Sequence, residues 1–595
     1  MPFQWIVWIL MIELFCFGRI TRSSLAYAQD DLIHQRLCPR VLLISNSRID
    51  LTADEGKMIC GDPKIQEWQN LPLQQVKIHL QGALQKRGYH HSHSRIVENG
   101  EQLTVYTGTT TTVKRIQVNG FSYERLLAVH STKLLGQTLT PGLLDQMQAY
   151  VQQQLWREGY PCASYQVMAD ADTGTVIVNV EIIKKRKILA VEEGIPPIDG
   201  MEAGVMSRYY AFHVGEIFQS DLMELTTRRM VADGIVQSAR YTVDCKDEGV
   251  VVKHYYTVGK PRLLSIGVGA SNEMYFLLRT NWKRIRLGSH GSSAKVELLA
   301  SSTEQSLEGS ATWFPSSFHP RFYFSPILAI RSEREKFYRT LTEQIKIGTG
   351  TSWEFSHASL HFNIGPLLNR QVIYRGIGPR SSNFLATNGS LELLEHDFEY
   401  YRTSPRDGYL LNFATTVTQE KLLSPLSAYF FSLSGQYLYN FKAKDPIILV
   451  LGVRGKISST LIPELEERQK KKEVPLLFRH FLGGIDDLRG FSRKQLPNDP
   501  NGALTSFYLG WEARFASFFY EKLQPLVFVD SGWLGMEPLK LKQTLYWSPG
   551  IGFRLESPIG SFRGSAAYGR VSNGTEEEKR GVGKMQYHLT YGQEF

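Results

Sequence analysis

The sequence predicts two architectures in one chain: tandem α+β domains in the N-terminal half, followed by a C-terminal transmembrane antiparallel β-barrel of roughly 16 strands. Three observations support this fold class. The first residues follow the pattern of an export signal. Near residue 260, segments that alternate between strand and helix give way to strand-like runs alone. The last segment alternates apolar and polar residues, as a strand between lipid and an aqueous lumen requires.

The composition narrows the class of protein. The chain of 595 residues is 42% hydrophobic and 21% charged, which is ordinary for a folded protein, and its length allows several domains. Its net charge is +9, but charges of both signs run through the whole length, so no basic domain indicates a nucleic-acid partner. The sequence contains no nucleophile motif and no set of metal ligands, and we expect neither an enzyme nor a bound cofactor or metal.

Residues 1–28 are predicted to be a signal peptide. Residues 3–17 are nearly all apolar, and Ala26 and Ala28 form a small-x-small cleavage site. Glu13 interrupts the apolar run, and Arg19 and Arg22 follow it, so an N-terminal membrane anchor or a wrongly assigned start is the alternative. Beyond this segment no apolar stretch reaches the length of about 18 residues that a spanning helix needs, which leaves strands as the only way to cross a membrane.

The N-terminal half repeats one order of elements. In its middle unit, residues 113–120 form a short alternating strand, residues 143–156 have helical spacing, and residues 165–168 and 175–183 form two strands around a turn. The same order recurs upstream and downstream with a period of about 70 to 75 residues, longer than most solenoid repeats. We therefore predict three tandem domains, which cover residues 37–110, 111–185 and 186–259.

Two groups of side chains in these domains could carry chemistry. The sequence allows two interpretations of Cys38 and Cys60. They form a disulfide, as cysteines of exported proteins often do, or they are two small buried residues without a bond. His90, His91 and His93 lie where a helix is expected to end, with no acidic residue or cysteine nearby, and they do not predict a metal site.

The predicted barrel covers residues 262–595. Helical periodicity is lost there, and about sixteen strands of ten residues would use a length of this order. Examples of the strand-like runs are residues 263–270, 294–300, 409–418, 426–437 and 447–456. A soluble all-β protein could use a similar number of strands, so the count alone does not establish a membrane protein.

The final segment favours the membrane. Four aromatic or apolar side chains share one face of a strand at residues 583–595, namely Tyr587, Leu589, Tyr591 and Phe595. Polar residues occupy the other face, and Gln593 is the one polar residue on the apolar face. A lipid-facing stripe opposite a lumen-facing stripe is what a barrel strand in a bilayer requires.

Strand parity predicts which charges lie inside the barrel. Glu512 and Arg514 share one face of a strand, and Trp511 lies on the other. Because a charge facing lipid costs up to roughly 2 to 4 kcal/mol near the bilayer midplane, Glu512 and Arg514 should face the lumen. On the next strand, Asp530 should face inward together with Phe528.

A short motif upstream of these strands consists of Leu488, Arg489, Gly490 and Phe491. It resembles the inward-folded loop motif of the outer-membrane barrel-assembly superfamily (the bacterial surface antigen family), which includes BamA, TamA and the two-partner secretion transporters. The resemblance implies that a long loop region at residues 456–503 folds into the barrel. It also implies that Arg489 reaches carboxylates on the inner wall, here Glu512 and Asp530, which its rigid guanidinium can bridge.

The rest of the chain extends this resemblance. Residues 113–120 resemble the opening strand of POTRA domains, and three such units make the chain most similar to the TamA type. The ending on Phe595 resembles the terminal signature by which barrel-assembly machinery recognises its clients. The resemblance places the barrel in the cell outer membrane and the N-terminal domains in the periplasm.

The function implied by the resemblance is protein assembly or translocation. POTRA domains would capture unfolded outer-membrane or secreted protein clients, and the barrel, in contact with outer-membrane lipid, would insert or export them. The resemblance allows, but does not require, a periplasmic or inner-membrane partner that binds the POTRA domains. One alternative is a two-partner-type secretion pore for a dedicated exported protein, and another is a barrel that carries a surface enzyme or adhesin activity in its long loop region.

Overall fold

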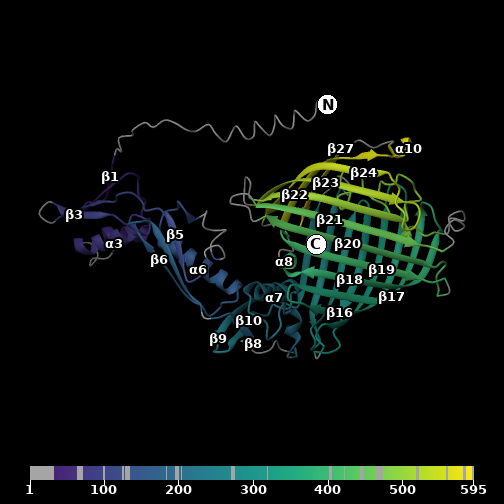
Figure 1. Ribbon diagram of the computed structural model, residues 1–595, viewed down its shortest axis with the longest axis horizontal. Coiled ribbons are helices and arrows are strands. Elements are labelled where there is room, and N and C mark those ends of the chain that lie inside the picture. The colour runs from purple at the N-terminus through teal and green to yellow at the C-terminus, as the bar shows by residue number, and fades with distance from the viewer. Residues whose placement is uncertain are drawn as a thin grey trace. The chain divides into compact units, whose positions relative to one another are not determined.

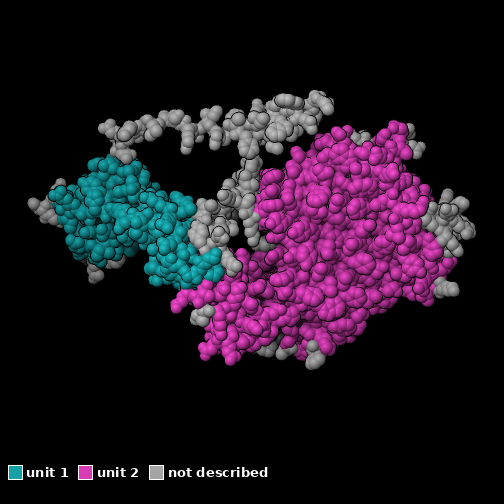
Figure 2. All heavy atoms as spheres, viewed as in Figure 1, with its two compact units in different colours: residues 1–123, 133–150, 165–180 teal, residues 124–132, 151–164, 181–595 magenta. Residues whose placement is uncertain are grey.

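The computed structural model forms two compact units (Figure 2), one of residues 1–123, 133–150 and 165–180 and the other of residues 124–132, 151–164 and 181–595. The structure describes residues 32–62, 64, 71–97, 101–122, 126, 134–182, 184–193, 200–202, 204–269, 275–317, 319–400, 405–420, 422–441, 448–463, 474–516, 522–557, 560–579 and 585–592. The predicted signal peptide and Phe595 lie outside these residues. Within the described ranges, no helix is both long enough and apolar enough to cross a membrane.

The first domain is a four-stranded sheet with two helices. Its elements are β1 (Ile33–Cys38), β2 (Val41–Ser45), α2 (Ala53–Cys60), α3 (Leu73–Gln85), β3 (His93–Val97) and β4 (Gln102–Tyr106). The strand order is β1-β2-β4-β3, with β2 parallel to β4. The buried core joins apolar residues of α3, such as Leu80 and Leu84, to Leu43 and Leu103 in the sheet. Strand β1 begins upstream of residue 37, so this sheet starts earlier than the predicted domain boundary.

The next two domains repeat a smaller three-stranded sheet. The first of them contains β5 (Arg115–Asn119), α6 (Pro141–Arg157), β6 (Ser164–Asp170) and β7 (Thr175–Glu181), in the strand order β5-β7-β6. The second contains β8 (Lys187–Glu193), the 3-10 helix η2 (Val205–Tyr209), α7 (Ser220–Asp233), β9 (Ser238–Cys245) and β10 (Gly249–Thr257), in the order β8-β10-β9. In both sheets the first strand is parallel to the central one.

Two disulfides fix parts of these domains. Cys38 at the end of β1 is bonded to Cys60 at the end of α2, which is one of the two alternatives that the sequence left open. Cys162 is bonded to Cys245 at the end of β9, across 83 residues of sequence. The sequence did not indicate this second bond, because neither its spacing nor its surroundings follow a known pattern.

Seventeen strands form one antiparallel sheet that curves into a barrel (Figure 1). They are β11 (Arg262–Gly269), β12 (Leu277–Leu287), β13 (Ser292–Ser301), β14 (Glu304–Thr312), β15 (Phe322–Arg334), β16 (Arg339–Glu354), β17 (Ala358–Arg375), β18 (Ser381–Glu395), β19 (Gly408–Thr418), β20 (Ala428–Phe441), β21 (Ile448–Leu461), β22 (Thr505–Ala516), β23 (Leu523–Gly535), β24 (Leu545–Ser557), β25 (Gly560–Tyr568), β26 (Arg570–Ser572) and β27 (Met585–Gly592). Both β25 and β26 pair with β24, so they share one position and leave sixteen positions around the barrel. The predicted fold class is confirmed.

The outer face of the barrel is apolar and the inner face is polar, as the period of two along a strand requires. On β16, for example, Ile345 and Ile347 are about half exposed on the outside, and Leu328 of β15 lies directly opposite Ile345. Inward-facing residues such as Asn369 and Gln371 on β17 are buried and polar. A bilayer therefore meets hydrocarbon side chains, while hydrogen-bonding groups point into the lumen.

Chain direction separates the two ends of the barrel. Strand β11 follows β10 of the third domain almost directly, so the barrel's lower end is the end next to that domain. Since neighbouring strands are antiparallel, the connections after β12, β14, β16 and β18 return to this lower end. The connection between β21 and β22 lies at the other end, which is called the upper end below.

Candidate functional site

The long connection between β21 and β22 fills part of the barrel lumen. Strand β21 continues to Leu461 through pairing with β20 and β22, so residues 456–461, predicted to belong to the loop, are part of a strand. The described part of the connection includes η3 (Leu476–Phe478). Its apolar side chains, among them Leu488 and Phe491, are buried against Tyr508 and Tyr546 of the barrel wall. The loop is thus packed inside the barrel as a second core.

Arg489 lies between two carboxylates of the barrel wall. Its Nε and Nη2 donate to the two carboxylate oxygens of Asp530 at 2.8 Å each. Its Nη1 donates to Oε2 of Glu512 at 3.0 Å. The guanidinium carbon lies 3.3 Å from the ring centroid of Phe528, so the planar group is stacked on an aromatic face. All three charged groups are buried, which makes these charge-assisted bonds strong and their loss costly.

The wall around Arg489 carries further charges. Nε of Arg514 donates to Oε1 of Glu512 at 2.5 Å, and Arg554 lies 3.5 Å from the same oxygen. The hydroxyl of Tyr508 donates to Asp530 at 3.2 Å. Glu512 therefore contacts three guanidinium groups, whereas Asp530 is held chiefly by Arg489. Trp511 is exposed on the outer face, and so parity divides this strand as its sequence pattern predicts.

Glycine allows the motif to approach the wall. A Cβ on Gly490 would lie 2.5 Å from Cβ of Ser548 and 2.6 Å from the backbone nitrogen of Gly569. Gly569 is the residue that separates β25 from β26, and a Cβ there would lie 2.3 Å from the carbonyl oxygen of Gly490. The loop and the wall meet backbone to backbone at this point, which no other residue type permits without a shift.

The same loop also reaches the opposite wall. Nη2 of Arg493 lies 2.8 Å from Glu304 of β14, and its Nε lies 2.9 Å from Glu335, just beyond β15. Nζ of Lys494 lies 3.3 Å from Glu333 and donates to the hydroxyl of Tyr338 at 2.6 Å. Residues 489–494 consequently span the lumen from β22 and β23 to β14 and β15. The sequence prediction missed Arg493 and Lys494, although two basic residues directly after the motif were the available signal.

The loop also contacts the last strand. Nε2 of His588, on β27, lies 2.8 Å from the carbonyl oxygen of Arg489, and His588 is buried on the inner side. Its neighbours Tyr587 and Leu589 are exposed on the outside, which is the alternation that the sequence predicts. Strand β27 lies beside β11, but no hydrogen-bonded ladder between them occurs within the described strands. These two strands are the edges of the sheet.

Cavities remain on both sides of the loop. One of about 290 Å³ lies between the loop and β15 to β17 and is lined by polar groups such as Thr342 and Gln344. Another of about 240 Å³ lies between the loop and β19 to β22, where Asp486 and Asp487 of the loop face Arg454. The lumen is therefore partly hollow and polar, with the loop between the two cavities.

The third domain is attached to the lower end of the barrel by a charged contact. Arg229 of α7 donates to both carboxylate oxygens of Glu399, at 2.9 and 2.6 Å, and lies 3.0 Å from Glu354 of β16. Glu399 belongs to α8 (His396–Tyr400), the short helix after β18. Although burial opposes the charge, the hydrogen bonds with Glu399 raise the pKa of Arg229 above its ordinary value.

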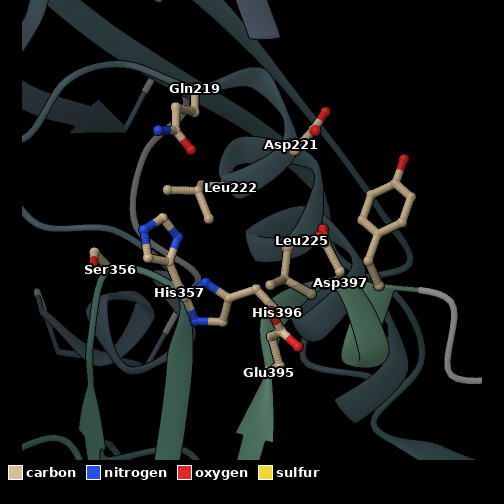
Figure 3. A pocket seen from close by; sticks show the side chains of 10 residues that line it. Gln219, Asp221, Leu222, Leu225, Ser356, His357, Glu395, His396 and Asp397 are labelled. Carbon is tan, nitrogen blue, oxygen red and sulfur yellow. The ribbon is translucent and has the colours of Figure 1, made fainter. Parts of the chain in front are cut away.

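A pocket of about 180 Å³ lies at this contact (Figure 3). Leu222 and Leu225 of α7 line it on one side, and His357, Glu395 and His396 of the barrel line it on the other. Nε2 of His396 is bonded to Glu354 at 2.6 Å, so this histidine belongs to the same charged contact. The described residues include no group of three or more His, Cys, Asp or Glu side chains that could hold a metal, here or at His90, His91 and His93.

Comparison with known proteins identifies the C-terminal part. Residues 379–595, which include the loop motif, Glu512 and Asp530, match the Omp85 superfamily domain. This part of the chain is an Omp85 domain. The predicted membership of the barrel-assembly superfamily is confirmed at the level of the superfamily. Omp85 barrels are outer-membrane proteins with periplasmic POTRA domains, and they serve protein assembly and translocation without being enzymes.

Similar solved structures include members of two groups. BamA from Haemophilus ducreyi lacking POTRA domains 1–3 has a TM-score of 0.49 and 14% identity, covering 82% of this chain and 100% of that one. CdiB from Acinetobacter baumannii has a TM-score of 0.46 and 12% identity, covering 81% and 90%. CdiB from Escherichia coli has a TM-score of 0.46 and 13% identity, covering 88% and 97%. No curated protein matches the chain.

Proposed function

We propose that the protein captures unfolded outer-membrane or secreted protein clients with its three N-terminal domains and inserts them into, or moves them across, the outer membrane through its barrel. The observation that carries this proposal is the loop inside the lumen, which is bonded to opposite walls by Arg489 on one side and by Arg493 and Lys494 on the other. A lumen occupied in this way favours action at the barrel wall over steady flow through a pore.

The sheet edges of the N-terminal domains offer a means of capture. In the second and third domains both outer strands of the three-stranded sheet, β5 and β6 or β8 and β9, have one unpaired side. An unpaired edge presents a row of backbone donors and acceptors to which an extended client can add a strand. In the first domain the outer strands β1 and β3 have one unpaired side each.

The junction of β11 and β27 offers a means of release into lipid. Both are edge strands that lie side by side, and outer-face residues next to the junction, such as Ile266 and Tyr587, are exposed and apolar. Opening a junction that lacks a hydrogen-bonded ladder costs less than breaking any of the other strand pairs. This supports the proposal that client hairpins are inserted laterally, with outer-membrane lipid as a direct partner of the barrel.

A dedicated secretion pore is the second candidate. It is favoured by the polar cavities beside the loop, because a displaced loop would leave a hydrophilic passage between the two walls. The resemblance of the sequence to the TamA type, with three POTRA-like domains, favours assembly over this alternative.

Depletion of the protein in its own host, followed by quantitative proteomics of the outer membrane and the medium, tests the proposal. Assembly activity predicts a fall in several outer-membrane proteins at once. The loss of a single secreted protein, with all outer-membrane proteins unchanged, would contradict it and favour the secretion pore. A chromosomal copy with Arg489→Ala serves as the matched loss-of-function control, and restoration by the wild-type gene excludes indirect effects.

A further inference from the structure

Charged side chains gather at the turn between β15 and β16. Glu333 and Glu335 lie on the inner side of the barrel, where Glu333 is paired with Lys494 and Glu335 with Arg493 of the loop. Arg334 and Arg339, which flank the turn, are exposed on the outer side.

Three arginines line up across three strands at this place. Arg334 of β15 pairs directly with Arg339 of β16, and Arg339 pairs directly with Arg375 of β17. For Arg334 and Arg339 the face follows from the ladder, since Leu328 and Ile345, six residues along the same strands, are exposed apolar residues of the outer face. Arg375 is exposed and lies at a register shift of β17 opposite Arg339. Neighbouring strands are about 4.8 Å apart, so the row spans roughly 10 Å.

Like charges placed directly opposite one another destabilise a sheet. By contrast, Glu343 of β16 lies opposite Arg370 of β17 on the same face and forms an ion pair with it at 3.5 Å. No carboxylate among the described residues forms an ion pair with any of the three arginines in the row. Arginine does not lose its charge at any physiological pH, so a bound anion would relieve the repulsion.

The position of the row indicates which anion. It lies at the upper end of the barrel, two rows of residues beyond the Glu343–Arg370 pair and past the apolar belt that includes Ile345. In an outer-membrane protein this is the level of the lipid headgroups on the far side from the third domain. Tyr374 beside Arg375 is exposed, and the guanidinium of Arg339 lies 5.8 Å from its ring centroid, an aromatic residue at the interface where such residues are enriched.

We propose that Arg334, Arg339 and Arg375 form a binding site for the phosphate groups of an outer-leaflet lipid. A guanidinium matches phosphate with two parallel hydrogen bonds, and three of them in a row can contact more than one phosphate. This site is independent of client handling in the lumen. It would fix the β15–β17 side of the barrel to the lipid surface, on strands that are far from β11 and β27 in the order of the sheet.

Lipid binding by the purified full-length protein in detergent tests the site. Native mass spectrometry would compare bisphosphorylated lipid A with its dephosphorylated form, and inorganic phosphate would be added as a competitor. We expect the dephosphorylated lipid, and the variant R334Q/R339Q/R375Q with the intact lipid, to bind at least about tenfold more weakly, since three charge-assisted contacts are lost. The control E343Q/R370Q removes a pair of opposite charges from the same face and should bind as the wild type does.

Several results would overturn the proposal. If the wild type binds both lipids equally, phosphate recognition is excluded, and this outcome is decisive without any variant. Undiminished binding by the triple variant, or an equal loss in the control, excludes this site. Displacement of the lipid by inorganic phosphate at a similar concentration would show a site for free anions only. If the triple variant does not fold, the single variant R339Q, which removes the central arginine, must show the loss.

Discussion

Nε2 of His588 lies 2.8 Å from the carbonyl oxygen of Arg489, so the residue that anchors the loop to the wall also contacts the last strand of the barrel. The loop and the edge strand β27 therefore share a hydrogen bond. A movement of either must break or carry along this contact. The predictions below follow from this relationship and from the other buried contacts of the loop and the domains.

Replacing Arg489 with alanine should abolish client assembly while leaving the barrel inserted. The change leaves Asp530 buried, with Tyr508 as its remaining side-chain partner among the described hydrogen bonds, and breaking a buried ion pair in this way costs about 3 to 5 kcal/mol. Trypsin access to the loop and heat-dependent gel mobility would report loop release and barrel folding separately. Arg489→Lys keeps the charge without the two-pronged geometry and should give partial activity. The exposed Arg570→Ala is the control, and full activity of Arg489→Ala would contradict the anchoring role.

Reversing the charges of Arg493 and Lys494 should open the lumen. Glutamate at both positions would face Glu304, Glu333 and Glu335, and repulsion would push the loop from that wall. Planar-bilayer recordings should then show larger and longer openings than in the wild type. Restoring opposite charges with Glu304→Arg and Glu333→Lys should close the pore again. An unchanged conductance of the reversed variant would mean that these pairs do not hold the loop.

His588→Ala should loosen β27 by a few-fold in hydrogen exchange, because one buried hydrogen bond contributes about 0.5 to 1.5 kcal/mol. Amide exchange of residues 585–592, followed by mass spectrometry in lipid nanodiscs, measures the effect. His361→Ala, another inward-facing histidine, on β17, is the matched control and should leave β27 unchanged. Equal exchange in the wild type and His588→Ala would show that the bond to Arg489 does not restrain the strand.

Arg229→Ala should release the third domain from the barrel. It leaves Glu354 and Glu399 without their shared guanidinium, although Arg321 still lies 2.8 Å from Glu354. Spin labels on α7 and on the lower end of the barrel would report the release as a broader distribution of distances. Arg240→Ala on β9 is the control, since that arginine contacts only the ring of Tyr255 among the interactions described. A distribution as narrow as in the wild type would argue against a stabilising role of the contact.

Acid should weaken the first domain through Glu55. Two hydrogen bonds from Arg87, at 3.1 and 2.7 Å, lower the pKa of Glu55 to about 2. Because the folded-state pKa lies below the unfolded value, this stabilisation is complete above about pH 4.5 and is lost as the pH falls towards 2. Amide protection of α2 in the full chain should decline over that range. In Glu55→Gln the decline should be smaller and protection at pH 7 lower, and an identical pH profile would contradict the assignment.

The barrel and its buried carboxylates could be predicted from sequence because alternation with a period of two leaves little freedom. A slip of one residue would turn Glu512 and Arg514 towards lipid and Trp511 into the lumen, at a cost of several kcal/mol. The same argument places Asp530 inside. Local patterns of this kind can be recognised in a single sequence. They predict the barrel strands and the two carboxylates that Arg489 of the loop contacts.

The contacts of Arg493 and Lys494 with the opposite wall could not be predicted, because their partners are distant in sequence and follow no local pattern. Arg493 meets Glu304, which is 189 residues upstream, and only the closed barrel brings them together. The division of one strand at Gly569 depends on the approach of Gly490, which is likewise a property of the tertiary fold. The bond between Cys162 and Cys245 joins positions whose spacing of 83 residues follows no pattern.

The Cys162–Cys245 disulfide has a mechanical consequence. A client protein that pulls on the N-terminal domains during transfer would put tension on the chain that leads to the barrel. The covalent link between these cysteines passes that force directly from residue 162 to residue 245, immediately before the last strand of the third domain. The segment between the two cysteines then carries no tension. Helix α7 lies in this segment and is bonded to the barrel through Arg229, so it stays folded while force is applied.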